Sequence, residues 1–438
     1  MAKKKQALSP EERLAAALVP EEEQPYALPD GWKWVRLGKI YDVNPKVQAD
    51  DDLEASFVTM SDISPGIKSQ FDFIVRKWGE IKKGHTQFAN GDVAFAKISP
   101  CFENRKSMIL DGLKNGIGAG TTELIVLRNP SIDNKYTFLF ISSEEFIRHA
   151  RNTYKGVVGQ QRINLDFVKN YPMPLPPLSE QRRLVARIES LFAKLDAARE
   201  KVQSVLNSHE TRKAALLHDA FAGKLTAKWR EERGIPQSWK NGKLLDCLLE
   251  KPRNGYSPKA VNYPTKCKSM SLSATTDGIF KKEYYKYIDE EIPADSYLWL
   301  EPGDILIQRS NSLEKVGISA IYTGGTHEYI YPDLMMKLQV NNQNDPAYIN
   351  YFLQRAETRA YFLSNATGIA GNMPKINQKT VSNTPVNYPS LTEQQEIVRI
   401  LDRLLAREQR ARQAAEETLV AIDRMKQAIL ARAFRGEL

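Results

Sequence analysis

The sequence predicts a mixed α/β (α+β) fold in two copies: two compact domains separated by two long helices that form an antiparallel coiled coil. Three observations support this prediction. The chain contains a pseudo-twofold internal repeat, each repeat ends in a long segment without proline or glycine, and the preceding regions alternate short strand-like runs with amphipathic helical stretches.

The internal repeat is clearest in its helical part. The segment LSEQRRLVARIESLFA, which begins at Leu178, matches LTEQQEIVRILDRLLA, which begins at Leu391. The closing segments HDAFAGKL and ARAFRGEL end at Leu225 and Leu438 with the same offset, so the two copies are equal in length. Upstream, GDV from Gly91 resembles GDI, and GVVGQQRIN resembles GIAGNMPKIN. A duplication with divergent outer domains explains these matches.

Each repeated segment predicts one continuous helix. Ser179 and Thr392 are expected N-caps, Thr392 with Gln395 fits a capping box, and glycines 223 and 436 are natural C-terminal stops. About 44 residues lie between these signals, which corresponds to a helix of roughly 65 Å.

Apolar residues in both helices follow a coiled-coil spacing that is firm at the ends and softer in the middle, where His209 and Arg212 interrupt the first copy. The expected helix and partner-docking positions are Leu184, Ile188, Leu191, Leu195, Ile397, Leu401, Leu404 and Ile422. Pairing within the chain, with the domains at opposite ends, is favoured because the copies are equal in length. A coiled coil between two chains is the alternative.

These signals divide the chain into five regions. Residues 1–27 form an N-terminal extension with a short helix that starts at a Ser9–Glu12 capping box. Residues 28–174 form the first domain, 175–226 the first long helix, 227–387 the second domain and 388–438 the second long helix. Runs such as DVAFAKI and DILIQRS predict strands, whereas KYTFLFISSEEFIRHARN and PAYINYFLQRAETRAYFLSN predict helices.

Two polar loops in each domain are candidates for reading DNA bases, because Gln, Asn and Arg have donor–acceptor patterns that match base edges. Paired glycines suit a loop whose backbone approaches a ligand closely. An ordinary polar surface loop is the alternative interpretation. The candidate residues are Lys97, Asn104, Arg105, Lys106, Gln160, Gln161 and Arg162 in the first domain, and Gln308, Arg309, Ser310, Asn311, Lys315, Asn372 and Lys375 in the second.

Composition favours a polyanionic partner, because 62 Lys and Arg against 53 Asp and Glu give a net charge of +9. No run is apolar enough to span a membrane, and three scattered cysteines suggest neither a disulfide framework nor zinc, so a cytoplasmic location is expected.

Three segments resemble parts of catalytic or nucleotide-binding motifs, but each is incomplete. GIGAG at 116–120 lacks the following helix of a dinucleotide site, Asp72 and Glu80 lack nuclease context, and Asn44-Pro45 stops short of an amino-methyltransferase motif. We therefore expect no catalytic residue, metal or bound cofactor in this chain.

The PLPPLSEQ motif with its long helix, AFAGKL and the degenerate second copy resemble the specificity subunit of type I restriction–modification systems, from about Pro29 to Leu438. The resemblance implies two target-recognition domains that each read half of a bipartite site in double-stranded DNA. It also implies helices that set the spacing and dock two modification subunits, which use S-adenosylmethionine, with restriction subunits adding ATP- and Mg-dependent cleavage. A stand-alone nuclease or methyltransferase with a recognition module, or a pure coiled-coil scaffold, is the alternative.

Overall fold

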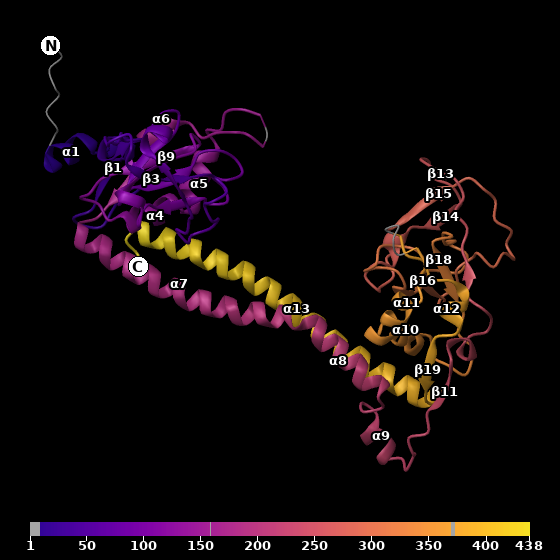
Figure 1. Ribbon diagram of the computed structural model, residues 1–438. Helices are drawn as coiled ribbons and strands as arrows, with labels where there is room; N and C mark the ends of the chain where they lie inside the picture. Colours follow the sequence, from indigo (N-terminus) through magenta and orange to yellow (C-terminus); the bar gives the residue numbers. More distant parts are fainter. Residues whose placement is uncertain (1–8, 158, 369–372) are drawn as a thin grey trace. The chain divides into compact units, whose positions relative to one another are not determined.

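The computed structural model describes residues 9–157, 159–368 and 373–438, and the chain divides into two compact units (Figure 1). The first unit comprises Met1–Gln203 with Glu417–Leu438, and the second comprises Ser204–Glu416. Each unit therefore contains one α/β domain together with parts of both long helices. In the described ranges, no helix is both long and apolar enough to cross a membrane.

The first unit starts with helix α1, Pro10–Ala17, whose N-terminus has the predicted capping box between Ser9 and Glu12. Its strands form three sheets, with orders β1–β10, β2–β9–β6–β7 and β4–β3–β8–β5. The strands are β1 (Lys33–Arg36), β2 (Asp42–Val43), β3 (Glu54–Val58), β4 (Ile74–Lys77), β5 (Thr86–Ala89), β6 (Val93–Ala96), β7 (Ser107–Ile109), β8 (Ile117–Gly120), β9 (Leu124–Arg128) and β10 (Pro172–Leu175). The helices are α2 (Leu37–Ile40), α3 (Trp78–Ile81), α4 (Asn134–Ile141), α5 (Glu144–Arg151) and α6 (Leu165–Asn170), with 3₁₀ turns η1 (Glu21–Glu23) and η2 (Lys114–Gly116).

The second unit also has three sheets, with orders β11–β19, β12–β18–β16–β17 and β13–β15–β14. The strands are β11 (Lys240–Lys243), β12 (Arg253–Asn254), β13 (Ala260–Val261), β14 (Cys267–Met270), β15 (Tyr285–Ile288), β16 (Ile305–Gln308), β17 (Ser319–Ile321), β18 (Met335–Leu338) and β19 (Pro385–Tyr388). The helices are α9 (Ala227–Glu231), α10 (Pro346–Gln354), α11 (Ala356–Ser364) and α12 (Gln378–Ser382), with 3₁₀ turns η3 (Leu244–Cys247) and η4 (Leu272–Ala274).

Each domain contains a four-stranded sheet of the same kind, which we call the shared sheet. Its two copies, β2–β9–β6–β7 and β12–β18–β16–β17, have the same strand order and are antiparallel throughout. The repeated Gly-Asp motif precedes its central strand in both domains. Asp92 accepts the Ala89 N–H at 2.8 Å, and Asp304 accepts the Glu301 N–H at 2.9 Å. Both aspartates are buried, so their side chains hold the turn that precedes the strand. The remaining sheet differs between the domains.

The long helices are antiparallel, and each unit contains part of the pair (Figure 1). They are α7 (Leu178–Asn207), α8 (His209–Phe221) and α13 (Leu391–Phe434). In the first unit, Asp196 pairs with Lys426 and Arg199 with Asp423, so partner numbers fall on α13 as they rise on α7. In the second unit, Arg212 on α8 pairs with Glu408 on α13 at 2.7 Å.

The first long helix is interrupted at Ser208, whereas the sequence predicts a continuous helix. The carbonyl of Val205 accepts hydrogen bonds from the Ser208 hydroxyl and the Arg212 guanidinium, both at 3.1 Å. These side chains compete with the helix for a backbone acceptor, which explains why the helix breaks where the apolar spacing is softest.

Both long helices also begin one residue before the predicted N-caps. Helix α7 starts at Leu178 and α13 at Leu391, so Ser179 and Thr392 lie inside the first turn and the predicted capping box at Thr392 is wrong. The backbone oxygens of Pro177 and Ser390 accept the first helical hydrogen bonds instead.

The glutamine of the repeated Glu-Gln motif joins each long helix to its domain. Gln394 is fully buried; its side-chain oxygen accepts the Asp345 N–H at 2.9 Å, and its amide nitrogen donates to Pro389 O at 3.0 Å. Gln181 makes the same two contacts with Asp133 and Pro176, both at 2.9 Å. Asp133 and Asp345 are the N-caps of α4 and α10. In each unit the glutamine therefore connects the long helix, the proline segment that precedes it, and α4 or α10.

Replacing Gln394 by alanine should lower the free energy of unfolding of the second unit by about 1–3 kcal/mol, because the Asp345 amide loses its buried acceptor. Urea unfolding measured by circular dichroism would test this value. Gln395→Ala is the matched control on the same helix, since Gln395 is exposed. An equal loss in both variants would contradict the assigned role.

The ends of the long helices complete the cores of the domains. Leu217, Ala220 and Phe221 of α8 lie in the core of the second unit. The repeat-related residues of α13, Leu430, Ala433 and Phe434, lie in the core of the first unit. Each unit thus takes the N-terminal part of one long helix and the C-terminal part of the other.

Four of the predicted helix positions also belong to these cores, which corrects their assignment to partner docking. Leu184 and Ile188 are fully buried in the first unit, and Ile397 and Leu401 in the second. Their side chains pack against the chain's own domains and leave no surface for another subunit. Ile422 is also buried, whereas Leu191, Leu195 and Leu404 are half-buried.

Candidate nucleic-acid interface

The two polar loops predicted in each domain lie side by side. In the first unit, the Ile163 N–H donates to Lys97 O at 3.0 Å and the Ser99 N–H donates to Gln161 O at 2.8 Å. In the second unit, the Ile376 N–H donates to Arg309 O at 2.9 Å. Bridges between Ile98 and Arg162 and between Ser310 and Lys375 occupy equivalent places. Two segments far apart in sequence therefore form one surface in each domain.

The residues after these loops explain why the motif repeats. Ile163 and Ile376 are buried, while Asn164 and Asn377 cap α6 and α12. The shared Ile-Asn pair anchors the loop, so the positions preceding it can differ without disturbing the fold.

Three cationic candidates of the first domain use their donors internally. Arg162 binds the Glu123 carboxylate at 2.8–3.1 Å, and this hydrogen bonding holds the pKa of Glu123 below its usual range. Arg105 pairs with Glu144 and donates to Ser142 O at 3.0 Å, while Lys106 donates to Met60 O at 2.6 Å. The sequence could not indicate these contacts, because each partner is distant along the chain.

In the second domain, Gln308 is fully buried. Its amide nitrogen donates to Leu272 O at 2.8 Å and Thr275 Oγ1 at 2.9 Å, and its oxygen accepts from Asn311 at 2.7 Å. We therefore assign Gln308 and Asn311 an internal role and leave them out of the proposed interface. Ser310 is also buried, and Arg309 donates to Asp333 O at 3.3 Å.

The remaining candidates are available to a ligand. Among the described residues, no hydrogen bond or ion pair is found for the side chains of Lys97, Asn104, Gln160, Gln161, Lys315 or Lys375. All of them are exposed or half-buried. Asn372 lies outside the described residues.

One basic and aromatic surface in the second domain was not among the loops predicted from the sequence. Strand β15 carries Tyr285, Lys286 and Tyr287, and the Lys268 ammonium on β14 lies 5.0 Å from the Tyr285 ring centroid. Tyr284 just before the strand is 42% exposed. The signal was the run KKEYYKY at 281–287, since lysine suits phosphates and tyrosine rings can stack on bases.

The described residues contain no group of three His, Cys, Asp or Glu side chains arranged to hold a metal ion. All three cysteines are free, and burial raises the pKa of Cys247 to about 12. A thiol with such a pKa remains protonated at neutral pH and is a poor nucleophile.

Comparison with known proteins identifies the family. A family model described as the type I restriction modification DNA specificity domain matches residues 29–207 and again 236–417. The EcoEI type I restriction enzyme specificity subunit of Escherichia coli is 27% identical over 90% of this chain and 82% of its own length. The EcoAI specificity subunit of Escherichia coli is 43% identical over 50% of this chain and 37% of its own length.

Solved structures show the same fold. A chain from a structure of a type I restriction–modification system has a TM-score of 0.74 at 22% identity, covering 94% of this chain and all of that one. The HsdS subunit of Thermoanaerobacter tengcongensis has a TM-score of 0.64 at 21% identity, covering 95% and 100%. Because the family model covers both halves of the chain, this protein belongs to the family of type I restriction–modification DNA specificity subunits and has two recognition domains.

Proposed function

We propose that the two domains each bind one half of a bipartite site in double-stranded DNA, using the paired loops described above. This proposal rests on one observation: the residues that repeat between the domains hold the fold, whereas the exposed loop residues differ. The repeated Gly-Asp, Glu-Gln and Ile-Asn motifs are occupied in holding each domain together. The exposed loop residues differ: Asn104 and Gln160 occur in one domain, and Lys315 and Lys375 in the other. Equal scaffolds with different loops suit two readers of different sequences.

We further propose that the chain recognises DNA without catalysing a reaction. Two modification subunits would supply methylation with S-adenosylmethionine, and restriction subunits would supply ATP- and Mg-dependent cleavage. The family membership and the net charge of +9 support this arrangement. The half-buried positions on the long helices, Leu191 and Leu195 in the first unit and Leu404 in the second, are those we assign to subunit docking.

The double variant Asn104→Ala/Gln160→Ala should relax sequence preference in one half of the target only. A bidentate base contact contributes about 1–3 kcal/mol of discrimination, so disfavoured bases at one half-site should gain tenfold or more in relative use. The measurement is methylome sequencing of a host that expresses the variant with its modification subunit. The chain without that subunit should leave DNA unmethylated. Relaxation of both halves, or of neither, would exclude these loops as readers.

The double variant Lys315→Ala/Lys375→Ala separates phosphate contacts from base contacts. If both lysines neutralise phosphates, affinity should fall for all sequences alike, and the slope of log affinity against log salt should become shallower by about 2. Lys33→Ala and Lys240→Ala are controls, because these exposed lysines lie outside the paired loops, at the first residues of the equivalent strands β1 and β11. An unchanged slope would remove these two lysines from the interface.

A further inference from the structure

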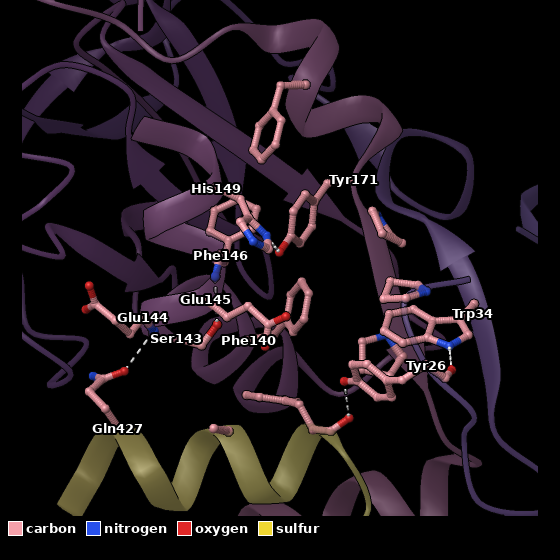
Figure 2. Close-up of a pocket in the computed structure, with 16 residues that line it drawn as sticks. Tyr26, Trp34, Phe140, Ser143, Glu144, Glu145, Phe146, His149, Tyr171 and Gln427 are labelled. Carbon is pink, nitrogen blue, oxygen red and sulfur yellow. Dashed lines mark hydrogen bonds between the residues drawn. The ribbon is translucent and has the colours of Figure 1, made fainter. Parts of the chain in front are cut away.

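The first unit contains a cavity of about 340 Å³ lined mainly by aromatic side chains (Figure 2). Its walls include Phe140 of α4, Phe146 of α5, Trp34 of β1 and Phe434 of α13. Tyr26 lies at one side, where its hydroxyl donates to Phe434 O at 3.2 Å and its ring meets Trp34 edge-on, with centroids 4.9 Å apart. The rings therefore give this partly open cavity a largely apolar lining.

Glu144 and Glu145 both line the cavity, and because the Glu144 carboxylate pairs with Arg105, the carboxylate of Glu145 is the one left for a ligand. Figure 2 shows the side chain of Glu145 reaching from α5 toward the ring of Phe140. Among the described residues no hydrogen bond or ion pair is found for this carboxylate. Burial raises the pKa of Tyr26 to about 12 and also raises the pKa of Tyr171. The negative charge of Glu145 contributes to both shifts. A half-buried carboxylate beside several ring faces provides both components of a site for an organic cation.

The second unit shows what fills the equivalent place. There, Phe221 and Phe352 take the positions of Phe434 and Phe140, as their packing confirms: Phe221 lies 4.8 Å from Tyr348, and Phe434 lies 5.3 Å from the equivalent Tyr136. Glu357 takes the position of Glu145, on α11 instead of α5. The carboxylate and the two phenylalanines are thus present in both units.

In the second unit the chain supplies its own cation to this group. The Arg355 guanidinium lies 5.0 Å from the Phe221 ring centroid and 5.9 Å from that of Phe352, and it pairs with Glu357 at 3.2 Å. His218 Nδ1 lies 3.0 Å from the same carboxylate oxygen. A guanidinium between aromatic faces and a carboxylate satisfies the charge and covers the rings.

The first unit lacks both of these side chains but has the others. Ser143 stands at the position of Arg355, and Ala431 at that of His218. Both small residues line the cavity. Arg435, which lies 5.8 Å from the Tyr26 ring centroid, is not among the lining residues. The space that a cation would fill and the negative charge of Glu145 that would attract it are therefore both present.

We propose that this cavity binds the guanidinium group of an arginine side chain from another polypeptide, which takes the place that Arg355 occupies in the second unit. Phe140 and Phe434 would contact its faces, and Glu145 would accept its hydrogen bonds. The site lies in the first unit alone, and it does not depend on DNA binding.

The test is calorimetric titration of the full chain with N-acetyl-arginine amide, with N-acetyl-citrulline amide as the neutral probe of the same shape. Wild type should prefer the arginine probe by about tenfold or more, because only that probe makes a charged hydrogen bond. Glu145→Gln should remove most of this preference. Glu22→Gln, which neutralises an exposed carboxylate outside the cavity, should leave it unchanged.

Two further variants use the equivalence of the units. Ser143→Arg should fill the cavity from within and abolish probe binding; an arginine is compatible with this helix start, since Arg355 occupies the same position before α11. The double variant Arg355→Ser/His218→Ala, which reproduces both differences between the units, should open the second site and raise the stoichiometry from one probe to two. Circular dichroism melting confirms that each variant is folded. Equal binding of both probes, binding insensitive to Glu145→Gln and Ser143→Arg, or no binding at the highest soluble probe concentration would overturn the proposal.

Discussion

Replacing Phe434 by alanine is expected to destabilise the first unit by about 3–5 kcal/mol, the usual cost of truncating a buried phenylalanine. Phe434 is 4% exposed, and its ring lies 5.3 Å from Tyr136 and 5.2 Å from Phe140. The residue comes from the second repeat, yet it fills the core of the domain built by the first. The effect should therefore appear far from the substitution in sequence.

Hydrogen–deuterium exchange resolves where stability is lost. Phe434→Ala should accelerate exchange in α4 and α5, while Phe221→Ala should accelerate it in α10 and α11. Each variant serves as the control for the other. Faster exchange of α10 and α11 in Phe434→Ala, with α4 and α5 unchanged, would show that the helix ends close the opposite domains from those assigned here.

Replacing Glu393 by alanine should destabilise the second unit by about 3–5 kcal/mol, because it leaves the buried Arg230 guanidinium without its counter-ion. The side chains of Glu393 and Arg230 are only 4% and 7% exposed. The same carboxylate oxygen also accepts the Thr226 hydroxyl at 2.7 Å. This cluster joins the start of α13 to the segment that follows α8.

The repeat provides a matched control in Glu180, which occupies the same motif position in the first copy. Its side chain is 28% exposed and pairs with Arg183, which is 55% exposed, so Glu180→Ala should cost only about 0–1 kcal/mol. Urea unfolding of both variants measures the difference. Similar losses would mean that the motif glutamate acts through the helix N-terminus, not through burial.

Much of this architecture was readable from the sequence because the chain repeats. The equal offset between Leu178 and Leu391 and between the two closing segments indicated the helix pair, and the structure confirms its antiparallel arrangement. Runs such as DVAFAKI and DILIQRS are strands β6 and β16 at the centre of the shared sheet. Hydrophobic periodicity carries this information locally, so it needs no knowledge of distant contacts.

Other features depend on contacts between distant segments. Gln308 was predicted in the interface, yet it is buried against Leu272 and Thr275, more than 30 residues away. The segments KYTFLFISSEEFIRHARN and PAYINYFLQRAETRAYFLSN were predicted to be helical, which is confirmed, but the sequence did not indicate that each forms two helices, which meet at Ser142–Ser143 and at Arg355. Polarity alone does not distinguish a side chain that meets DNA from one that holds a loop.

The closure of each domain by a helix end from the other half of the chain bears on how genes of this kind can recombine. Replacing the coding region for Lys240–Tyr388 would exchange all three sheets and the loops of the second domain while leaving Leu217 and Phe221 in place. An incoming domain would need to keep the aromatic residues of α10 that pack against Phe221 and the N-cap of α10 that binds Gln394. Recognition could then diversify by exchange of whole domains, because the joints fall next to the repeated long helices, which stay in place.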